Sequence, residues 1–181
     1  MAKRLAVLLF TSSLFLAQAG CVQAKDVRLL TPAQLEDPAQ VSSWLKQHAG
    51  AADKARAAAA YADGVKEARR NSWGTALKAY GLSALLHPTP QALNAYADAL
   101  LRLSGSLREQ KNNRAQHQDR DLQSFEALLR SALASDAVLA SLSKQERQQT
   151  LADAECVAAY RRDKSVQAPC TPLKTYGLTK H

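Results

Sequence analysis

The chain has 181 residues, of which 46% are hydrophobic and only 6% aromatic, and its formal net charge is +8. This composition is typical of a single globular domain and argues against a disordered or fibrous chain. Seven glycines and six prolines are too few for the many turns of a β-sandwich or barrel, and alanine, leucine and glutamine favour helices, so we predict an all-α fold.

The first 24 residues have the pattern of a bacterial-type secretory signal. Lys3 and Arg4 precede an apolar run over residues 5–16, which is interrupted only at 11–13 and is followed by small residues. This run is well short of the ~20 residues that span a bilayer, and no later stretch approaches that length. We therefore expect residues 1–24 to be removed and the protein to work in the periplasm.

The fate of Cys21 depends on where the leader is cut. Residues 16–21 resemble a lipobox, although Gln18 stands where an aliphatic residue is preferred. Residues 1–20 would then be a lipoprotein signal, and a lipid on Cys21 would anchor the protein to the outer membrane. Cleavage after Ala19 would leave Cys21 as a lone thiol, which cysteine parity disfavours, and cleavage after Ala24 would discard it.

The charge of the mature chain bears on its partners. Removal of the leader leaves about 22 basic against 16 acidic residues. Outside the cytoplasm, a domain this basic is attracted to anionic lipid, to cell-wall polymer or to an acidic partner protein. The compartment argues against nucleic acid as a ligand. The alternative is a soluble protein whose positive charge serves no specific site.

Residues 25–103 predict short helices followed by longer amphipathic ones. Within 25–52, Thr31 and Asp37 each precede a proline and stand three residues before a glutamine, a pattern that starts a helix. Within 53–103, apolar stripes at helical spacing predict consecutive antiparallel helices joined by short turns. These run from Asp53 to about Arg70, from Trp73 to the prolines after His87, and from about Leu93 to Ser104 and Gly105.

A polar stretch over residues 104–121 interrupts the apolar pattern. It predicts either a long solvated loop or a polar extension of a helix. The apolar stripe resumes at Leu122, and residues 122–181 hold the last helices and the tail. Ser143 and Glu146 form a capping box that opens the final long helix.

Cys156 and Cys170 are the cysteines that remain once the leader and Cys21 are set aside, and an oxidising compartment lets them pair. We predict a disulfide that pins the tail, residues 171–181, onto the last long helix. By chain-entropy reasoning, closing a loop of this size contributes ~3 kcal/mol. The alternatives are weak, because a metal needs more ligands than two cysteines and redox catalysis usually shows a C-x-x-C pair.

Residues 57–90 resemble one tetratricopeptide repeat, a 34-residue helix pair with small residues where its two helices touch. The residues that match the family pattern, counted from Ala57, are Gly64, Ala76, Tyr80 and Pro88. The chain departs from that pattern at Ala60 and Asp63, where tryptophan and leucine are usual. The resemblance implies stacked helical hairpins whose first helices line a concave surface. An unrelated, alanine-rich helical hairpin or an irregular bundle is the alternative.

Stacked hairpins would present a shallow, basic surface. The residues expected to face it are Tyr61, Val65 and Arg69 on one helix, then Ala95, Ala99 and Arg102 on another. We single out Tyr61, Arg69 and Arg102 as binding residues, because arginine pairs with carboxylates and tyrosine offers stacking area. The alternative is that Tyr61 and Val65 belong to the core and the arginines face solvent.

Motifs of catalysis are absent from the sequence. The histidines at positions 48, 87, 117 and 181 stand singly, and there is no H-E-x-x-H, G-x-S-x-G or phosphate-binding glycine loop. We therefore predict that the protein is not an enzyme and binds no metal or cofactor.

The sequence thus predicts an exported, noncatalytic adaptor that binds another envelope or secreted protein with an acidic surface. An immunity or inhibitor protein that neutralises an exported toxin is the alternative, and no residue selects it. A cell-wall hydrolase or redox enzyme is a weaker third hypothesis, since it needs a cleft in which titratable side chains converge.

Overall fold

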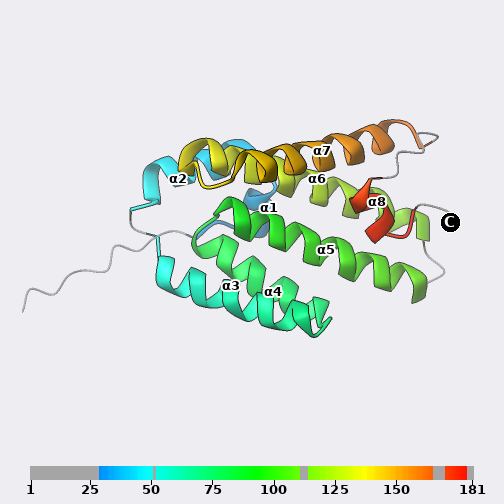
Figure 1. Ribbon diagram of the computed structural model, residues 1–181, viewed down its shortest axis with the longest axis horizontal. Helices are drawn as coiled ribbons and strands as arrows, with labels where there is room; N and C mark the ends of the chain where they lie inside the picture. Colours follow the sequence, from blue (N-terminus) through cyan, green and yellow to red (C-terminus); the bar gives the residue numbers. More distant parts are fainter. Residues whose placement is uncertain (1–28, 51, 111–113, 165–169, 179–181) are drawn as a thin grey trace, which may run out of the picture.

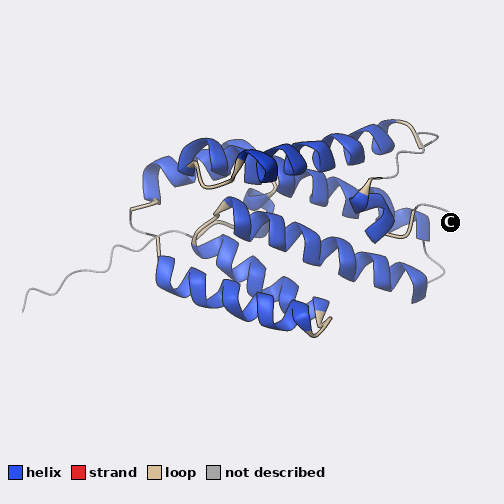
Figure 2. Ribbon diagram, viewed as in Figure 1, coloured by secondary structure: helices blue, strands red, loops and turns tan. Residues whose placement is uncertain are grey.

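A computed structural model describes residues 29–50, 52–110, 114–164 and 170–178 of the protein. Within these ranges the secondary structure is helical and contains no strand (Figure 1, Figure 2). The predicted all-α fold is therefore confirmed. The predicted leader and Cys21 lie outside the described residues, so the leader and its processing stay predictions.

Eight helices follow one another in the described part of the chain. In order they are α1 (Pro32–Leu35), α2 (Pro38–His48), α3 (Lys54–Arg69), α4 (Trp73–Leu86), α5 (Pro90–Gln110), α6 (Arg114–Leu139), α7 (Lys144–Arg162) and α8 (Thr171–Thr175). Short turns join α3 to α4, α4 to α5 and α6 to α7, so these neighbours run antiparallel, as the sequence predicted.

Polar caps fix where several of these helices begin. Thr31 and Ser143 each take part in a capping box, at the starts of α1 and α7. Asp37 and Asp53 accept hydrogen bonds from backbone amides at the starts of α2 and α3. Each such cap is worth ~0.5–2 kcal/mol, and all four positions agree with the sequence-based prediction.

The long helices pack mainly on their neighbours in sequence. Each of α3, α4, α5, α6 and α7 packs on the next (Figure 1). The exception is α2, which packs against α6, so that a helix from the beginning of the described chain joins the α6–α7 end of the molecule. Because α5 and α7 both run antiparallel to α6, they are parallel to each other (Figure 1).

Two hydrophobic clusters hold the bundle together. The larger cluster unites α1, α2, α4, α5, α6, α7 and α8, and its fully buried side chains include Leu35, Val41, Leu93, Leu122, Val157 and Leu173. The smaller cluster consists of Ala76, Tyr80 and Ala99 and joins α4 to α5, with side chains of α3 packed against it. Complete burial of one leucine or valine side chain contributes ~1.5–3 kcal/mol, so the larger cluster provides most of the driving force.

A glycine allows the close packing of α3 on α4. A Cβ added at Gly64 would lie 2.5 Å from Cδ1 of Tyr80, well inside the contact distance of two carbon atoms. The Tyr80 side chain is only 6% exposed, so its ring has little room to move aside. Gly64 is therefore a small residue at the contact between α3 and α4, as the sequence pattern predicted.

The predicted end of α5 at Ser104 and Gly105 is wrong, because the helix continues to Gln110. Gly105 is a packing residue: a Cβ there would lie 2.9 Å from the backbone oxygen of Thr175 in α8. Gly105 is thus needed for the close approach of α8, and it does not end the helix. Of the two alternatives for residues 104–121, the helical extension holds in the described residues, since α6 begins at Arg114.

The tail is held from three sides. The predicted disulfide is present, and it joins Cys156 of α7 to Cys170, which immediately precedes α8. Arg108 of α5 donates hydrogen bonds to the backbone oxygens of Tyr176 and Gly177, at 3.3 and 2.9 Å. The Tyr176 hydroxyl donates to Asp121 of α6 at 2.8 Å. The tail therefore contacts α5 and α6 as well as the last long helix.

Candidate functional site

Two hollows lie end to end along α3. The first has a volume of about 230 Å³ and lies where the start of α3 meets the end of α4; its lining includes Lys54, Ala58, Tyr61, Ser83, His87 and Gln91. The second is lined by the far half of the same helix: Tyr61, Ala62, Val65, Lys66, Arg69 and Arg70. Because Tyr61 lines both, we treat them as one surface and call it the α3 groove.

Tyr61 belongs to this groove and to the interior at once. Its ring packs on Tyr80, with 5.4 Å between ring centroids, and the side chain is half-buried against the smaller cluster. Val65 is also half-buried there. The two alternatives drawn from the sequence, a core residue and a surface residue, are therefore both partly correct for Tyr61 and Val65.

The rim of the α3 groove is basic. Four of its lining residues are Lys54, Lys66, Arg69 and Arg70, and no carboxylate lines either hollow. An ion pair with Glu67, at 3.1 Å, engages Arg70. Lys54, Lys66 and Arg69 form no ion pair within 4 Å among the described residues. Their charges therefore remain available to an acidic ligand.

The structure brings Tyr61 and Arg69 together but places Arg102 elsewhere. Arg102 lies on α5, where it pairs with Asp98 at 2.8 Å and its guanidinium lies 4.7 Å from the centroid of a Trp73 ring. It lines neither hollow of the α3 groove. Ala99, which we expected on the same concave surface, is fully buried in the smaller cluster, so that expectation is wrong.

The environment of Tyr80 shows how α3 and α5 converge on α4. Burial raises the pKa of the Tyr80 hydroxyl, nearby Tyr61 and Asp98 raise it further, and Arg69 lowers it. Arg69 comes from α3 and Asp98 from α5, so both helices bring charge near the same hydroxyl.

His87 provides an uncommitted polar atom in the first hollow. Its Nε2 is buried and has no hydrogen-bond partner among the described residues. Burial and, to a smaller extent, the charge of Lys54 lower the pKa of this imidazole, so the ring is neutral at physiological pH. A neutral imidazole nitrogen next to an apolar wall can exchange a hydrogen bond with a ligand.

A third hollow, which no sequence pattern indicated, lies between α5 and α7 and is floored by α6. It has a volume of about 260 Å³, and the residues that line it include Asp98 on α5, Asp153 on α7 and Pro172 on α8. We call it the α5/α7 cleft. Asp98 and Asp153 lie far apart in the sequence, and only the packing of both helices on α6 brings them to one hollow.

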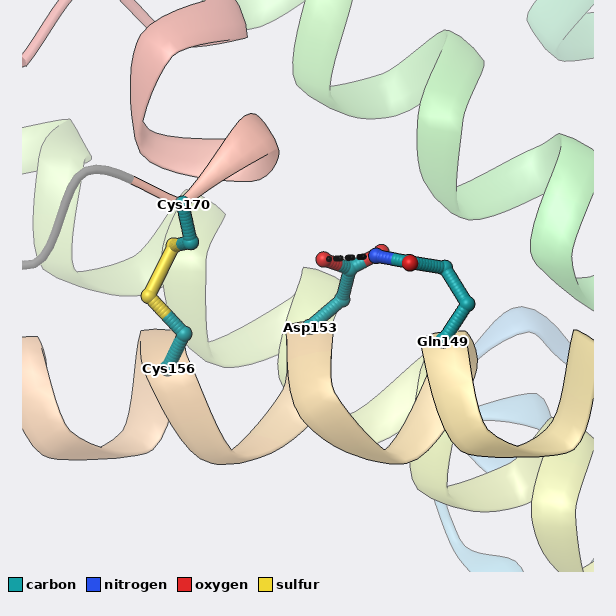
Figure 3. The surroundings of a disulfide bond; sticks show 4 residues. All are labelled: Gln149, Asp153, Cys156 and Cys170. Atoms are coloured by element: carbon teal, nitrogen blue, oxygen red, sulfur yellow. Dashed lines mark hydrogen bonds between the residues drawn. A yellow bond between two sulfur atoms is a disulfide. The ribbon is translucent and has the colours of Figure 1, made fainter. Parts of the chain in front are cut away.

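The disulfide stands at the α8 end of this cleft. The Cα atoms of Cys156 and Cys170 are 6.5 Å apart. Figure 3 shows the bond beside Asp153 and Gln149, which project from α7 on the same side as Cys156. By holding Cys170, the bond fixes the start of α8, which forms the end wall of the cleft.

The described ranges offer few features of other kinds of site. They contain no group of three or more histidine, cysteine or acidic side chains placed to hold a metal ion. None of their helices is long and apolar enough to span a membrane. Comparison of the chain with models of known families, with curated proteins and with solved structures finds no match.

Proposed function

We propose that the protein is an exported, noncatalytic binding module that receives an acidic segment of another envelope or secreted protein in the α3 groove. The observation that carries this proposal is the composition of the groove. Four basic side chains and an exposed part of Tyr61 surround an apolar wall, and no carboxylate is present to repel an acidic partner.

The dimensions of α3 indicate the length of chain that fits. A helix of 16 residues is ~24 Å long, and an extended peptide covers ~3.3 Å per residue. About seven residues of an extended partner would therefore span the groove from Lys54 to Arg70. Arg69 would pair with a carboxylate, while Tyr61 would supply rigid contact area near the middle.

Export is proposed on two grounds. The leader pattern over residues 1–24 is one, and the disulfide between Cys156 and Cys170 is the other, since such bonds persist in oxidising compartments. A lipid on Cys21, which would attach the protein to the outer membrane, stays a prediction.

Kinship with tetratricopeptide repeats likewise stays a prediction. The order in which α3, α4, α5 and α6 pack, and the contact between Gly64 and Tyr80, support it. The packing of α2 on α6 departs from it, because in a repeat array each unit contacts only its neighbours.

A capture experiment tests the proposal. Wild-type protein and a Lys66→Ala, Arg69→Ala double variant would be immobilised, exposed to envelope extract, and compared by quantitative mass spectrometry. A Lys46→Ala, Lys78→Ala variant removes the same charge from exposed positions outside the groove and serves as control. We expect the control to retain the wild-type partners, which should carry acidic segments, and the groove variant to lose them. Equal recovery by all three proteins would refute the role of the groove.

Arg102 needs its own variant because it lies outside the groove lining. Asp98 and Trp73 already engage its guanidinium, so Arg102→Ala should reduce capture less than Arg69→Ala does. A loss as large as that of Arg69→Ala would extend the binding surface onto α5.

A further inference from the structure

The α5/α7 cleft is preformed by contacts of α5 with α7 and with the turn that leads into α7. Near the start of α5, Gln91 donates a hydrogen bond to the backbone oxygen of Ser141 at 2.9 Å. One turn further along, Asn94 Nδ2 donates to Thr150 Oγ1 at 3.0 Å. These bonds close one end of the cleft, and α8 closes the other with Pro172 and the disulfide behind it.

Carboxylates from both α5 and α7 line this cleft. Because α5 and α7 are parallel, Asp98 and Asp153 each lie about one helical turn beyond the Asn94–Thr150 bond, in the same direction. Glu146 also contributes to the lining, and no lysine, arginine or histidine does. On a chain whose net charge is +8, this hollow is acidic.

Of the three carboxylates, Asp153 is the one that is half-buried and has no cation among the described residues, since Glu146 is exposed. Asp98 pairs with Arg102, and Glu146 accepts the amide of Ser143 in the capping box of α7. Asp153 is half-buried and has no ion pair within the described residues; its hydrogen bond comes from the amide of Gln149, at 3.0 Å (Figure 3). Burial raises the pKa of Asp153 and the Gln149 bond offsets this only in part, as expected for a desolvated carboxyl that lacks a positive partner.

A second atom in the cleft also lacks a partner. Oδ1 of Asn94 is buried and accepts no hydrogen bond from the described residues, although Nδ2 of the same side chain is bonded. Buried acceptors of this kind are rarely left unsatisfied. A ligand that carries several N–H donors and a positive charge would satisfy Asn94 Oδ1 and neutralise Asp153 together.

The floor determines what else the ligand must contain. Leu101 of α5 and Phe125 and Leu129 of α6 form it, and all three are buried. Apolar side chains at the base of a charged hollow favour binding of a ligand with a hydrocarbon stem and do not stabilise a hydrated inorganic cation. We propose that the α5/α7 cleft binds an ammonium or guanidinium group on an aliphatic stem, with Asp153 as the counter-ion and Asn94 Oδ1 as a hydrogen-bond acceptor.

Titration of the full chain with small amines tests this proposal independently of the α3 groove. The probes are pentylamine, its neutral analogue pentanol, and Nα-acetyl-lysine amide, each added to isotopically labelled protein and followed by NMR. Pentylamine should shift the signals of Asn94, Asp98 and Asp153, and pentanol should not. Stronger binding of the lysine derivative would identify a protein side chain as the source of the amine, and stronger binding of pentylamine a free amine.

Two matched variants locate the charge. Asp153→Asn keeps the shape of the side chain and should weaken pentylamine binding about tenfold, as expected for a charge-assisted contact. Glu155→Gln removes the same charge from an exposed position about 200° around α7 and should leave binding unchanged. Failure of both amines to bind the wild type, or equal affinity of Asp153→Asn, would overturn the proposal. If Asp153→Asn does not fold, the wild type alone decides: pentylamine-induced signal shifts confined to residues outside the cleft would overturn the proposal.

Discussion

Gly64 is the residue at which the packing of α3 on α4 leaves no room for a side chain. Gly64→Ala would gain up to ~1 kcal/mol in helix propensity but would force its Cβ against the ring of Tyr80, which typically costs ~1–3 kcal/mol. We therefore expect a net loss of stability, measured as a lower midpoint of urea unfolding followed by circular dichroism. Gly74→Ala is the control: a Cβ there meets nothing within 4 Å, so this variant should be stabilised.

Asp136 is a buried carboxylate that connects the end of α6 to the start of α7. It accepts the amide of Leu142 at 2.7 Å and the guanidinium of Arg147 at 2.6 Å. Burial opposes its ionisation, but hydrogen bonding and the positive charge of Arg147 together outweigh burial and lower the pKa of the carboxyl. Asp136→Asn should therefore cost ~1.5–3 kcal/mol near neutral pH.

The same carboxylate makes stability depend on pH. Because the folded-state pKa of Asp136 is lowered, its contribution is complete above the unfolded pKa of about 4 and is lost as the pH falls through the folded pKa. The difference in unfolding free energy between wild type and Asp136→Asn should thus shrink from about pH 7 to about pH 3. A difference that stays constant over this range would contradict the assignment. The control Asp63→Asn, at an exposed position, should have the same unfolding free energy as the wild type at both pH values.

At the scale of elements, α8 depends on the disulfide more than any long helix does. It has only five residues, too few to be stable alone. Replacing Cys156 and Cys170 by serine should lower the unfolding free energy by ~3 kcal/mol, and reductant should lower the melting temperature of the wild type. The double-serine variant should not respond to reductant. Alkylation of both thiols in the native, unreduced protein would contradict the bond.

The elements also show which local signals could be interpreted from sequence. The starts of α2 and α7 were predictable because a capping side chain and its amide are three residues apart or fewer. The end of α5 was not, because Gly105 faces Thr175, a residue 70 positions away. A glycine needed for packing and a glycine that ends a helix are identical in a sequence.

The candidate site residues also fall into those that local sequence spacing could predict and those that only the packing of distant helices brings together. Tyr61 and Arg69 lie two turns apart on one helix, so helical spacing alone placed them on one face. Asp98, Asp153 and Asn94 meet only because α5 and α7 both pack on α6. Arg102 has the right spacing but Trp73 and Asp98 engage it, a contact between helices that periodicity does not reveal.

For the whole molecule, the predicted leader allows the most direct test. If residues 1–24 are removed, the mass of the mature protein purified from its native host should correspond to a chain that begins at Lys25. Intact-mass spectrometry distinguishes this from a chain that begins at an acylated Cys21, which would be heavier and would partition into detergent. Recovery of the protein with Met1 and the complete leader would contradict export.

The pairing of α2 with α6 sets how such a protein can diversify. Repeat proteins can gain or lose whole repeats, because each repeat contacts only its neighbours. Here α2, near the start of the described chain, packs on α6, in its second half. A helix pair inserted or deleted between them would disturb this contact. If the protein binds a partner as proposed, a new specificity would arise more readily by point substitution on the existing surface than by addition of a helix pair.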